Sequence, residues 1–189
     1  MPLSSKSKIV FVLGLIAFGI LSRVLPHAWN FTPITAIVLF SAAYFGIVYS
    51  LIIFLMVMVV SDLHLGFYEW HIMLAVYGSF AIASLIGLLL KNKSMGVVFM
   101  GTISSSVLFF AITNWAVWQF STLYSHSLSG LLQSYVMALP FFRNSLAGDV
   151  CYSGFLFGAY ELYSKLKLKP NQSFQIASAK FNFSGKRLR

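Results

Sequence analysis

Charged residues are scarce in this sequence, and acidic residues are the scarcest of them. Of the 189 residues, 9% are charged and four are Asp or Glu, whereas a soluble domain carries about 25% charged residues. So few charges cannot cover a surface exposed to water, and 59% of the residues are hydrophobic. The composition excludes a soluble domain and predicts a single all-helical membrane domain.

Cysteine is also nearly absent. The one cysteine, Cys151, cannot form an internal disulfide and lacks the second cysteine of a C-x-x-C motif. The four histidines show no H-x-x-x-H spacing typical of a metal site. The chain contains no G-x-S-x-G, no H-E-x-x-H and no phosphate-binding or dinucleotide-binding glycine motif. We predict no catalytic residue, no metal and no cofactor, and a membrane enzyme without such a motif stays open.

Long apolar runs are abundant, and the run at 28–61 needs interpretation. It contains no Asp, Glu, Lys, Arg or His in 34 residues, whereas one crossing needs about 20 residues. Two crossings with a turn at 44–46 place nearly all basic residues on one side of the membrane, and one crossing does not. We therefore expect six membrane-spanning helices in a compact bundle. Their ranges are 9–24, 33–46, 47–61, 72–90, 95–118 and 145–163.

A further apolar segment, 130–141, is too short to span the membrane. If it crossed, the basic segment 165–189 would lie outside, contrary to the excess of Lys and Arg in cytoplasmic segments. We expect 130–141 to lie at the outer face or to enter the membrane and return.

The basic residues predict that both chain ends lie in the cytoplasm. Eleven of the 13 Lys and Arg residues then lie inside, and the exceptions are Arg23 and Arg143. The segment 165–189 holds seven of them and no acidic residue, and each contributes about 1 kcal/mol to binding anionic lipids. It presents no clear aromatic platform for nucleic acid, so no nucleic-acid partner is predicted.

Polar side chains gather at the expected outer ends of the helices, where such groups usually face the bundle interior or a cavity. Asp149 lies at least one turn inside the last helix, and Ser145 and Ser153 extend its face as a polar stripe. Asp149 either forms a structural ion pair with Arg23 or Arg143, or lines a pocket. The predicted pocket residues are Asn30, Asp62, Asn114, Trp115, Arg143, Asn144 and Asp149, with Arg23 and His27 shaping the first loop.

Four stretches are similar to those of uncharacterised bacterial membrane proteins, a group that resembles the substrate-binding S components of energy-coupling-factor (ECF) transporters. The similarity covers roughly residues 20–160 of the chain. The stretches are R-V-L-P-H-A-W-N-F-T-P from Arg23, S-D-L-H-L-G-F from Ser61, I-T-N-W-A-V-W from Ile112 and A-L-P-F-F-R-N-S-L-A-G-D from Ala138.

This resemblance implies a multi-pass protein of the bacterial inner membrane that binds a vitamin or other micronutrient in a pocket open to the outside. It also implies ECF transmembrane and ATPase subunits as partners. S components usually dock on them through an A-x-x-x-A face of the first helix, where this chain has Gly14, Ala17 and Gly19. An uptake protein acting alone therefore stays open. Arg143 would pair with an anionic ligand group or with Asp149, and a ligand ring would stack on Trp115.

The alternative function is a non-catalytic membrane scaffold, similar in fold to the small subunits of cell-shape complexes. The two functions predict different interiors at the outer end of the bundle. Binding requires a cavity of a few hundred cubic ångströms there, and a scaffold would be packed solid.

Overall fold

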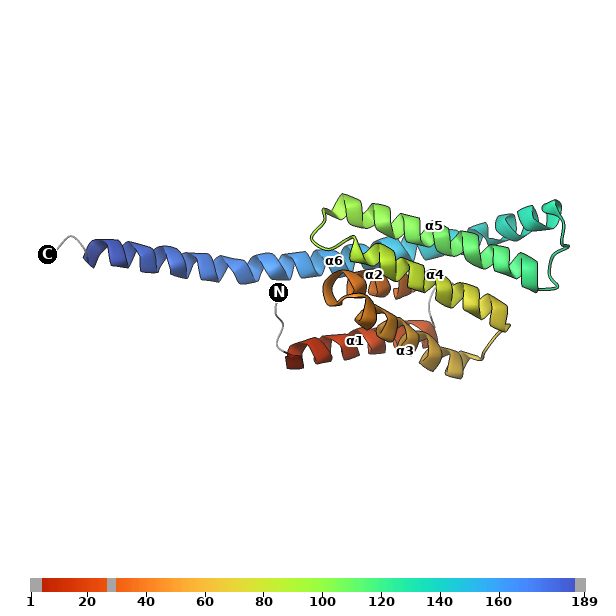
Figure 1. Ribbon diagram of the computed structural model, residues 1–189, viewed down its shortest axis with the longest axis horizontal. Coiled ribbons are helices and arrows are strands. Elements are labelled where there is room, and N and C mark those ends of the chain that lie inside the picture. Colours follow the sequence, from red (N-terminus) through yellow and green to blue (C-terminus); the bar gives the residue numbers. More distant parts are fainter. Residues whose placement is uncertain (1–4, 27–29, 186–189) are drawn as a thin grey trace.

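The computed structural model describes residues 5–26 and 30–185, with side chains described as far as residue 166. Within these ranges the chain forms six α-helices and no strand (Figure 1), which confirms the all-helical fold. The helices are α1 (Ser5–Val24), α2 (Ile34–Phe45), α3 (Ile47–Leu65), α4 (Trp70–Leu88), α5 (Met95–Phe120) and α6 (Leu128–Gly185).

Four helices of the described chain, α1, α3, α4 and α5, are long and apolar enough to cross a membrane. Large apolar side chains on their outer surfaces are exposed, for example Leu13 on α1 and Leu85 on α4. Exposed apolar area on this scale is stable against lipid and unfavourable in water. The chain is a membrane protein, as its composition predicts.

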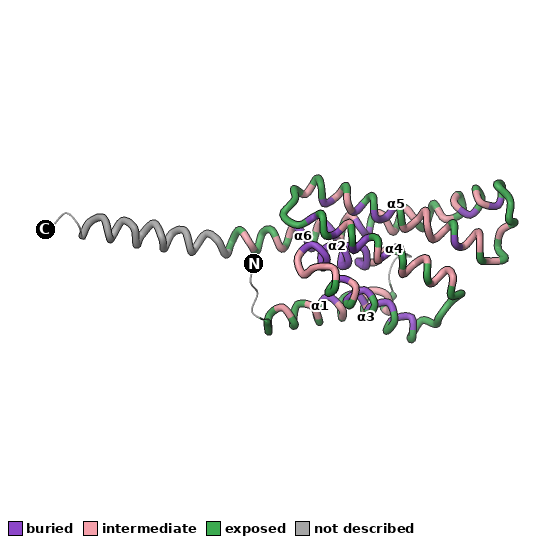
Figure 2. Tube along the Cα trace, in the orientation of Figure 1, coloured by how far each residue is buried: buried purple, intermediate pink, exposed green. Residues whose placement is uncertain are grey.

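α2 forms the centre of the bundle. All ten of its residues from Ile34 to Ala43 are buried, and it contacts each of the other five described helices. Figure 2 shows it as the mostly purple segment in the middle of the molecule. A helix that is buried on every side must be hydrophobic on every side, which explains why this part of the sequence carries no charge.

The turn between α2 and α3 consists of one residue, Gly46. Its φ is +91°, a conformation that glycine adopts far more readily than other residues. α2 ends at Phe45 and α3 begins at Ile47. Within 28–61 the structure therefore has two helices that meet at Gly46, inside the predicted turn at 44–46.

Two glycines let neighbouring helices approach closely. A Cβ at Gly87 would lie 2.7 Å from the carbonyl oxygen of Leu39, so α4 lies directly against the backbone of α2. A Cβ at Gly19 would lie 2.7 Å from the Val57 side chain, where α1 packs on α3. Small residues at such contacts favour helix association in membranes.

α6 differs most from the expected organisation. We expected a separate segment at 130–141 and a last helix at 145–163, followed by a basic tail at 165–189. One continuous helix instead begins at Leu128, covers both segments and continues to Gly185. The expected break between them was wrong.

Contacts with α5 explain why α6 continues. The Tyr135 hydroxyl donates to the carbonyl oxygen of Ala111 on α5 at 2.8 Å, and the Phe142 and Phe110 rings lie 4.5 Å apart. These contacts hold the first part of α6 alongside α5 (Figure 1). Pro140 removes one backbone donor within a helix, and neighbouring helices can compensate for that in a membrane bundle.

Candidate functional site

A cavity of about 410 Å³ lies between the helices at the end of the bundle that carries the α1–α2 and α3–α4 loops. Every described helix contributes at least one side chain to its wall. The lining residues are Arg23, Asn30, Thr32, Ile34, Thr35, Met58, Leu65, Tyr68, Val76, Phe80, Phe109, Ser145 and Asp149.

The short length of α2 accounts for the position of this cavity. α2 has 12 residues, about 18 Å at 1.5 Å per residue, while its neighbours α3 and α4 have 19 residues each. The first turn of α2, at Ile34 and Thr35, lines the cavity. The central helix therefore begins inside the bundle, and the space beyond its first turn lies between the longer helices around it.

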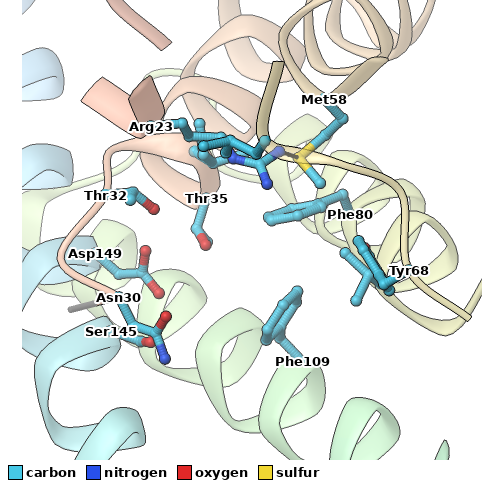
Figure 3. A pocket seen from close by; sticks show the side chains of 13 residues that line it. Arg23, Asn30, Thr32, Thr35, Met58, Tyr68, Phe80, Phe109, Ser145 and Asp149 are labelled. Carbon is cyan, nitrogen blue, oxygen red and sulfur yellow. Dashed lines mark hydrogen bonds between the residues drawn. The ribbon is translucent and has the colours of Figure 1, made fainter. Parts of the chain in front are cut away.

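The loop before α2 completes the wall. Phe31 and Thr32 lie against α6 at Gly148, where an added Cβ would be 3.3 Å from the Phe31 Cα and the Thr32 nitrogen. Asn30 has a φ of +59°, which asparagine tolerates better than most residues. This close approach of loop and helix brings Asn30 and Thr32 into the cavity wall beside Asp149 (Figure 3).

Asp149 dominates the polar side of the cavity. The residue is 5% exposed, and its Oδ2 accepts a hydrogen bond of 2.6 Å from the Ser106 hydroxyl. The Thr35 hydroxyl faces the same carboxylate (Figure 3). A second cavity of about 200 Å³ adjoins the first, because Asn30, Ser145 and Asp149 line both. Asp149 is thus buried in the protein and yet borders two open spaces.

Aromatic side chains form the opposite side of the cavity. The Phe80 and Phe109 rings have centroids 5.1 Å apart, and Tyr68 lies next to them (Figure 3). Burial, together with the nearby Asp62 carboxylate, raises the pKa of Tyr68 to about 12 against an opposing effect of Arg23. The Tyr68 phenol is therefore neutral at physiological pH and can donate a hydrogen bond. The cavity has one polar wall and one aromatic wall.

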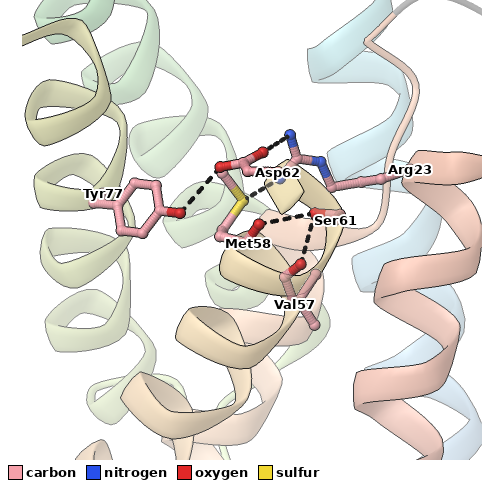
Figure 4. Close-up of polar contacts among 6 residues, drawn as sticks. All are labelled: Arg23, Val57, Met58, Ser61, Asp62 and Tyr77. Atoms are coloured by element: carbon pink, nitrogen blue, oxygen red, sulfur yellow. Dashed lines mark hydrogen bonds and ion pairs between the residues drawn. The ribbon is translucent and has the colours of Figure 1, made fainter. Parts of the chain in front are cut away.

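Arg23 reaches the cavity from α1 but is held by Asp62. The two side chains form an ion pair of 2.8 Å, and Asp62 is 1% exposed. Tyr77 on α4 donates to the other carboxylate oxygen at 3.0 Å, and the Arg23 guanidinium also contacts the Met58 sulfur (Figure 4). This network joins α1, α3 and α4, and it neutralises the charge of Arg23 within the protein.

The structure brings together some of the predicted site residues. Arg23, Asn30 and Asp149 line the larger cavity, and Asn114 lines the adjoining one. Asp62 lies behind Arg23 as its partner. His27 lies outside the described residues.

Other predicted site residues lie elsewhere. Trp115, Arg143 and Asn144 are exposed and line neither cavity. Arg143 precedes Asp149 by six residues, which at 3.6 residues per turn places the two side chains on different faces of α6. Both roles expected for Arg143 therefore lack support in the structure, and the Trp115 ring instead contacts Phe120.

Several lining residues were missed in the sequence. Thr35, Ser106, Phe80 and Phe109 are uncharged side chains within apolar helices, where hydroxyl and aromatic residues are common and carry no motif. A helical spacing of three or four residues is the only signal they offer. That spacing shows a shared face and does not show what the face contacts.

The chain belongs to the DUF6580 family, a family of unknown function, which it matches over residues 3–172. Neither the curated proteins nor the solved structures contain a significant match to the chain.

Proposed function

We propose that this member of the DUF6580 family is a membrane-embedded substrate-binding subunit for uptake of a vitamin or other micronutrient, similar to an ECF S component. The cavity of about 410 Å³ is the observation that supports the proposal, because ligand sites are clefts of about 300–1,000 Å³ with a few convergent polar groups. A non-catalytic scaffold would have a solid interior at this position. The cavity therefore favours binding over the scaffold.

We also propose that the chain crosses the bacterial inner membrane six times, with both of its ends in the cytoplasm. The start of α1 and the α4–α5 turn with Lys91 and Lys93 lie at one end of the bundle, and the α3–α4 and α5–α6 loops lie at the other (Figure 1). The excess of basic residues assigns the first end to the cytoplasm. The cavity then lies toward the outside, where a subunit that captures nutrients would need it.

The short helix α2 fits this topology in spite of its length. Twelve residues do not span a hydrocarbon core of about 30 Å, but α2 is enclosed by the other helices, so its ends need no contact with lipid. Irregular backbone within a membrane is tolerated when protein shields it. The loop before α2 can thus complete the crossing from inside the bundle.

The topology can be tested with single cysteines. In a Cys151→Ser background, Leu123→Cys places a thiol in the α5–α6 loop and Lys93→Cys places one in the α4–α5 turn. An impermeant maleimide should label Leu123→Cys in intact cells, and Lys93→Cys only after the membrane is permeabilised. Labelling of both sites in intact cells, or the reverse order, would refute the proposed orientation.

Binding can be tested by native mass spectrometry of gently purified protein. Wild type should retain a small molecule, and Ser145→Trp should lose it because Ser145 lines both cavities. Ser104→Trp is the matched control, since it makes the same substitution at an exposed position of α5. No retained molecule in wild type, or equal retention by both variants, would argue against a ligand in this cavity.

ECF transmembrane and ATPase subunits remain predicted partners, and anionic lipid remains a predicted partner of the basic C-terminal segment. Copurification tests the first prediction. If the tagged protein recovers an ATPase in stoichiometric amount, the subunit is driven by such a module. If it recovers none while still transporting its ligand, the protein acts alone.

A further inference from the structure

Negatively charged side chains outnumber positively charged ones at the cavity. Arg23, Asp62 and Asp149 are the charged side chains in or directly behind its described wall, one positive and two negative. The Asp62 carboxylate already compensates the positive charge of Arg23 through their ion pair. The Asp149 carboxylate is thus left without a cation among the described residues, and its close partner, Ser106, is a neutral hydroxyl.

A buried carboxylate in this state is unusual. Charged side chains are almost never fully buried unless they are paired, because the charge loses its hydration without compensation. The first turn of α2 contributes only a partial positive charge to the same space. Asp149 borders both cavities, so a group within the cavity could contact the carboxylate directly.

The wall opposite Asp149 also favours a cationic or flat aromatic group. Phe80, Phe109 and Tyr68 present aromatic side chains to the cavity (Figure 3). Aromatic faces attract cations and also stack on flat rings. An anionic ligand would find no free cation in the described wall, because it would have to separate Arg23 from Asp62 first.

We infer that the ligand of this cavity is an organic cation, with a protonated or permanently charged nitrogen against Asp149 and a flat apolar part against Phe80 and Phe109. This inference rests on the proposed binding function and adds the charge class of the substrate to it. Asn30, Thr32 and Ser145 surround the carboxylate and offer further hydrogen bonds to the donors of the same group (Figure 3).

Three probes of equal shape test the charge preference. Benzamidine is cationic at neutral pH, benzamide is neutral and benzoate is anionic, and all three have the same flat ring. Their binding is measured by saturation-transfer NMR with the protein in nanodiscs of zwitterionic lipid, and empty nanodiscs provide the background. Benzamidine should bind wild type at least tenfold more tightly than benzamide, which is about 1.4 kcal/mol, and benzoate should bind more weakly still.

Asp149→Asn should reduce the preference for benzamidine over benzamide to less than about threefold, since it removes the charge and keeps the shape. Arg143→Gln, a change of an exposed charge on the same helix, should leave the preference intact. Asp149→Asn should also unfold no earlier than wild type, because an unpaired buried charge is lost. If this variant does not fold, the order of affinity of the three probes for wild type still tests the inferred preference for a cation.

The possible results distinguish a failure of the cation inference from a failure of the proposed binding function. Equal binding of benzamide, or tighter binding of benzoate, would overturn the cation inference and leave a binding subunit. A neutral or anionic molecule retained in native mass spectrometry would do the same, and a retained cation would support the inference. If no probe binds and no molecule is retained, both the inference and the proposed function fail.

Discussion

Replacing Asp62 by asparagine should destabilise the bundle, because it leaves the Arg23 guanidinium without its partner. The two groups lie 2.8 Å apart, where opposite unit charges attract by about 6 kcal/mol at an effective dielectric constant of about 20. Removing one partner of a buried pair usually costs about 3–5 kcal/mol. The Arg23 side chain is 18% exposed and can regain some hydration, so we expect a loss of about 2–3 kcal/mol.

The assay is unfolding in mixed micelles, with SDS as the denaturant and circular dichroism as the signal. Glu161→Gln is the matched control, because Glu161 and Lys165 form a pair of similar length, 2.7 Å, with side chains 50% and 68% exposed. An exposed pair of this kind contributes about 0.3–0.5 kcal/mol. Equal losses for Asp62→Asn and Glu161→Gln would refute the reasoning, since burial would then make no difference.

Of the remaining predictions, those for Gly87 and Ser106 use the same unfolding assay, and the one for Gly148 uses native mass spectrometry. Gly87→Ala should cost about 2–3 kcal/mol because the new Cβ would meet the α2 backbone at 2.7 Å, and Gly78→Ala, with open space on the same helix, should cost nothing and can stabilise by up to about 1 kcal/mol. Gly148→Val should displace the loop before α2 and abolish retention of the small molecule, while Gly158→Val, with nothing within 4 Å, should retain it. Ser106→Ala should cost about 1–3 kcal/mol, because the Asp149 carboxylate loses its hydroxyl donor; an unchanged midpoint would show that this bond contributes nothing.

Much of the fold follows from the sequence. The expected bounds of the first five helices lie within four residues of those in the described chain, because apolar runs, charged ends and Gly46 mark them clearly. α6 was the exception. The short length of 130–141 and the basic segment 165–189 favoured a separate outer segment, but packing of Tyr135 and Phe142 on α5 makes 130–141 part of one helix. Such contacts join residues far apart in the chain and leave no periodic signal.

Part of the site was also predictable from the sequence. Asp149, Arg23 and Asn30 stand out in an apolar sequence because intramembrane polar residues are costly. Arg143 and Trp115 stand out equally, and only the direction of their side chains separates them from the cavity residues. Which charges pair is decided by the arrangement of α1, α3 and α6. The sequence alone offered Asp149 both Arg23 and Arg143 as partners.

The contrast between the two buried carboxylates carries the functional argument further than the cavity alone. Asp62 and Asp149 are 1% and 5% exposed, so both lose most of their hydration. Asp62 regains stability from Arg23 and Tyr77, and it lies behind the cavity wall. Asp149 has neutral partners and lies in the wall itself. Sites where local stability is sacrificed tend to be functional. A carboxylate that only fixed helix packing would be paired behind the cavity wall, as Asp62 is. Asp149 lies in the wall itself, where a bound cation could compensate its charge.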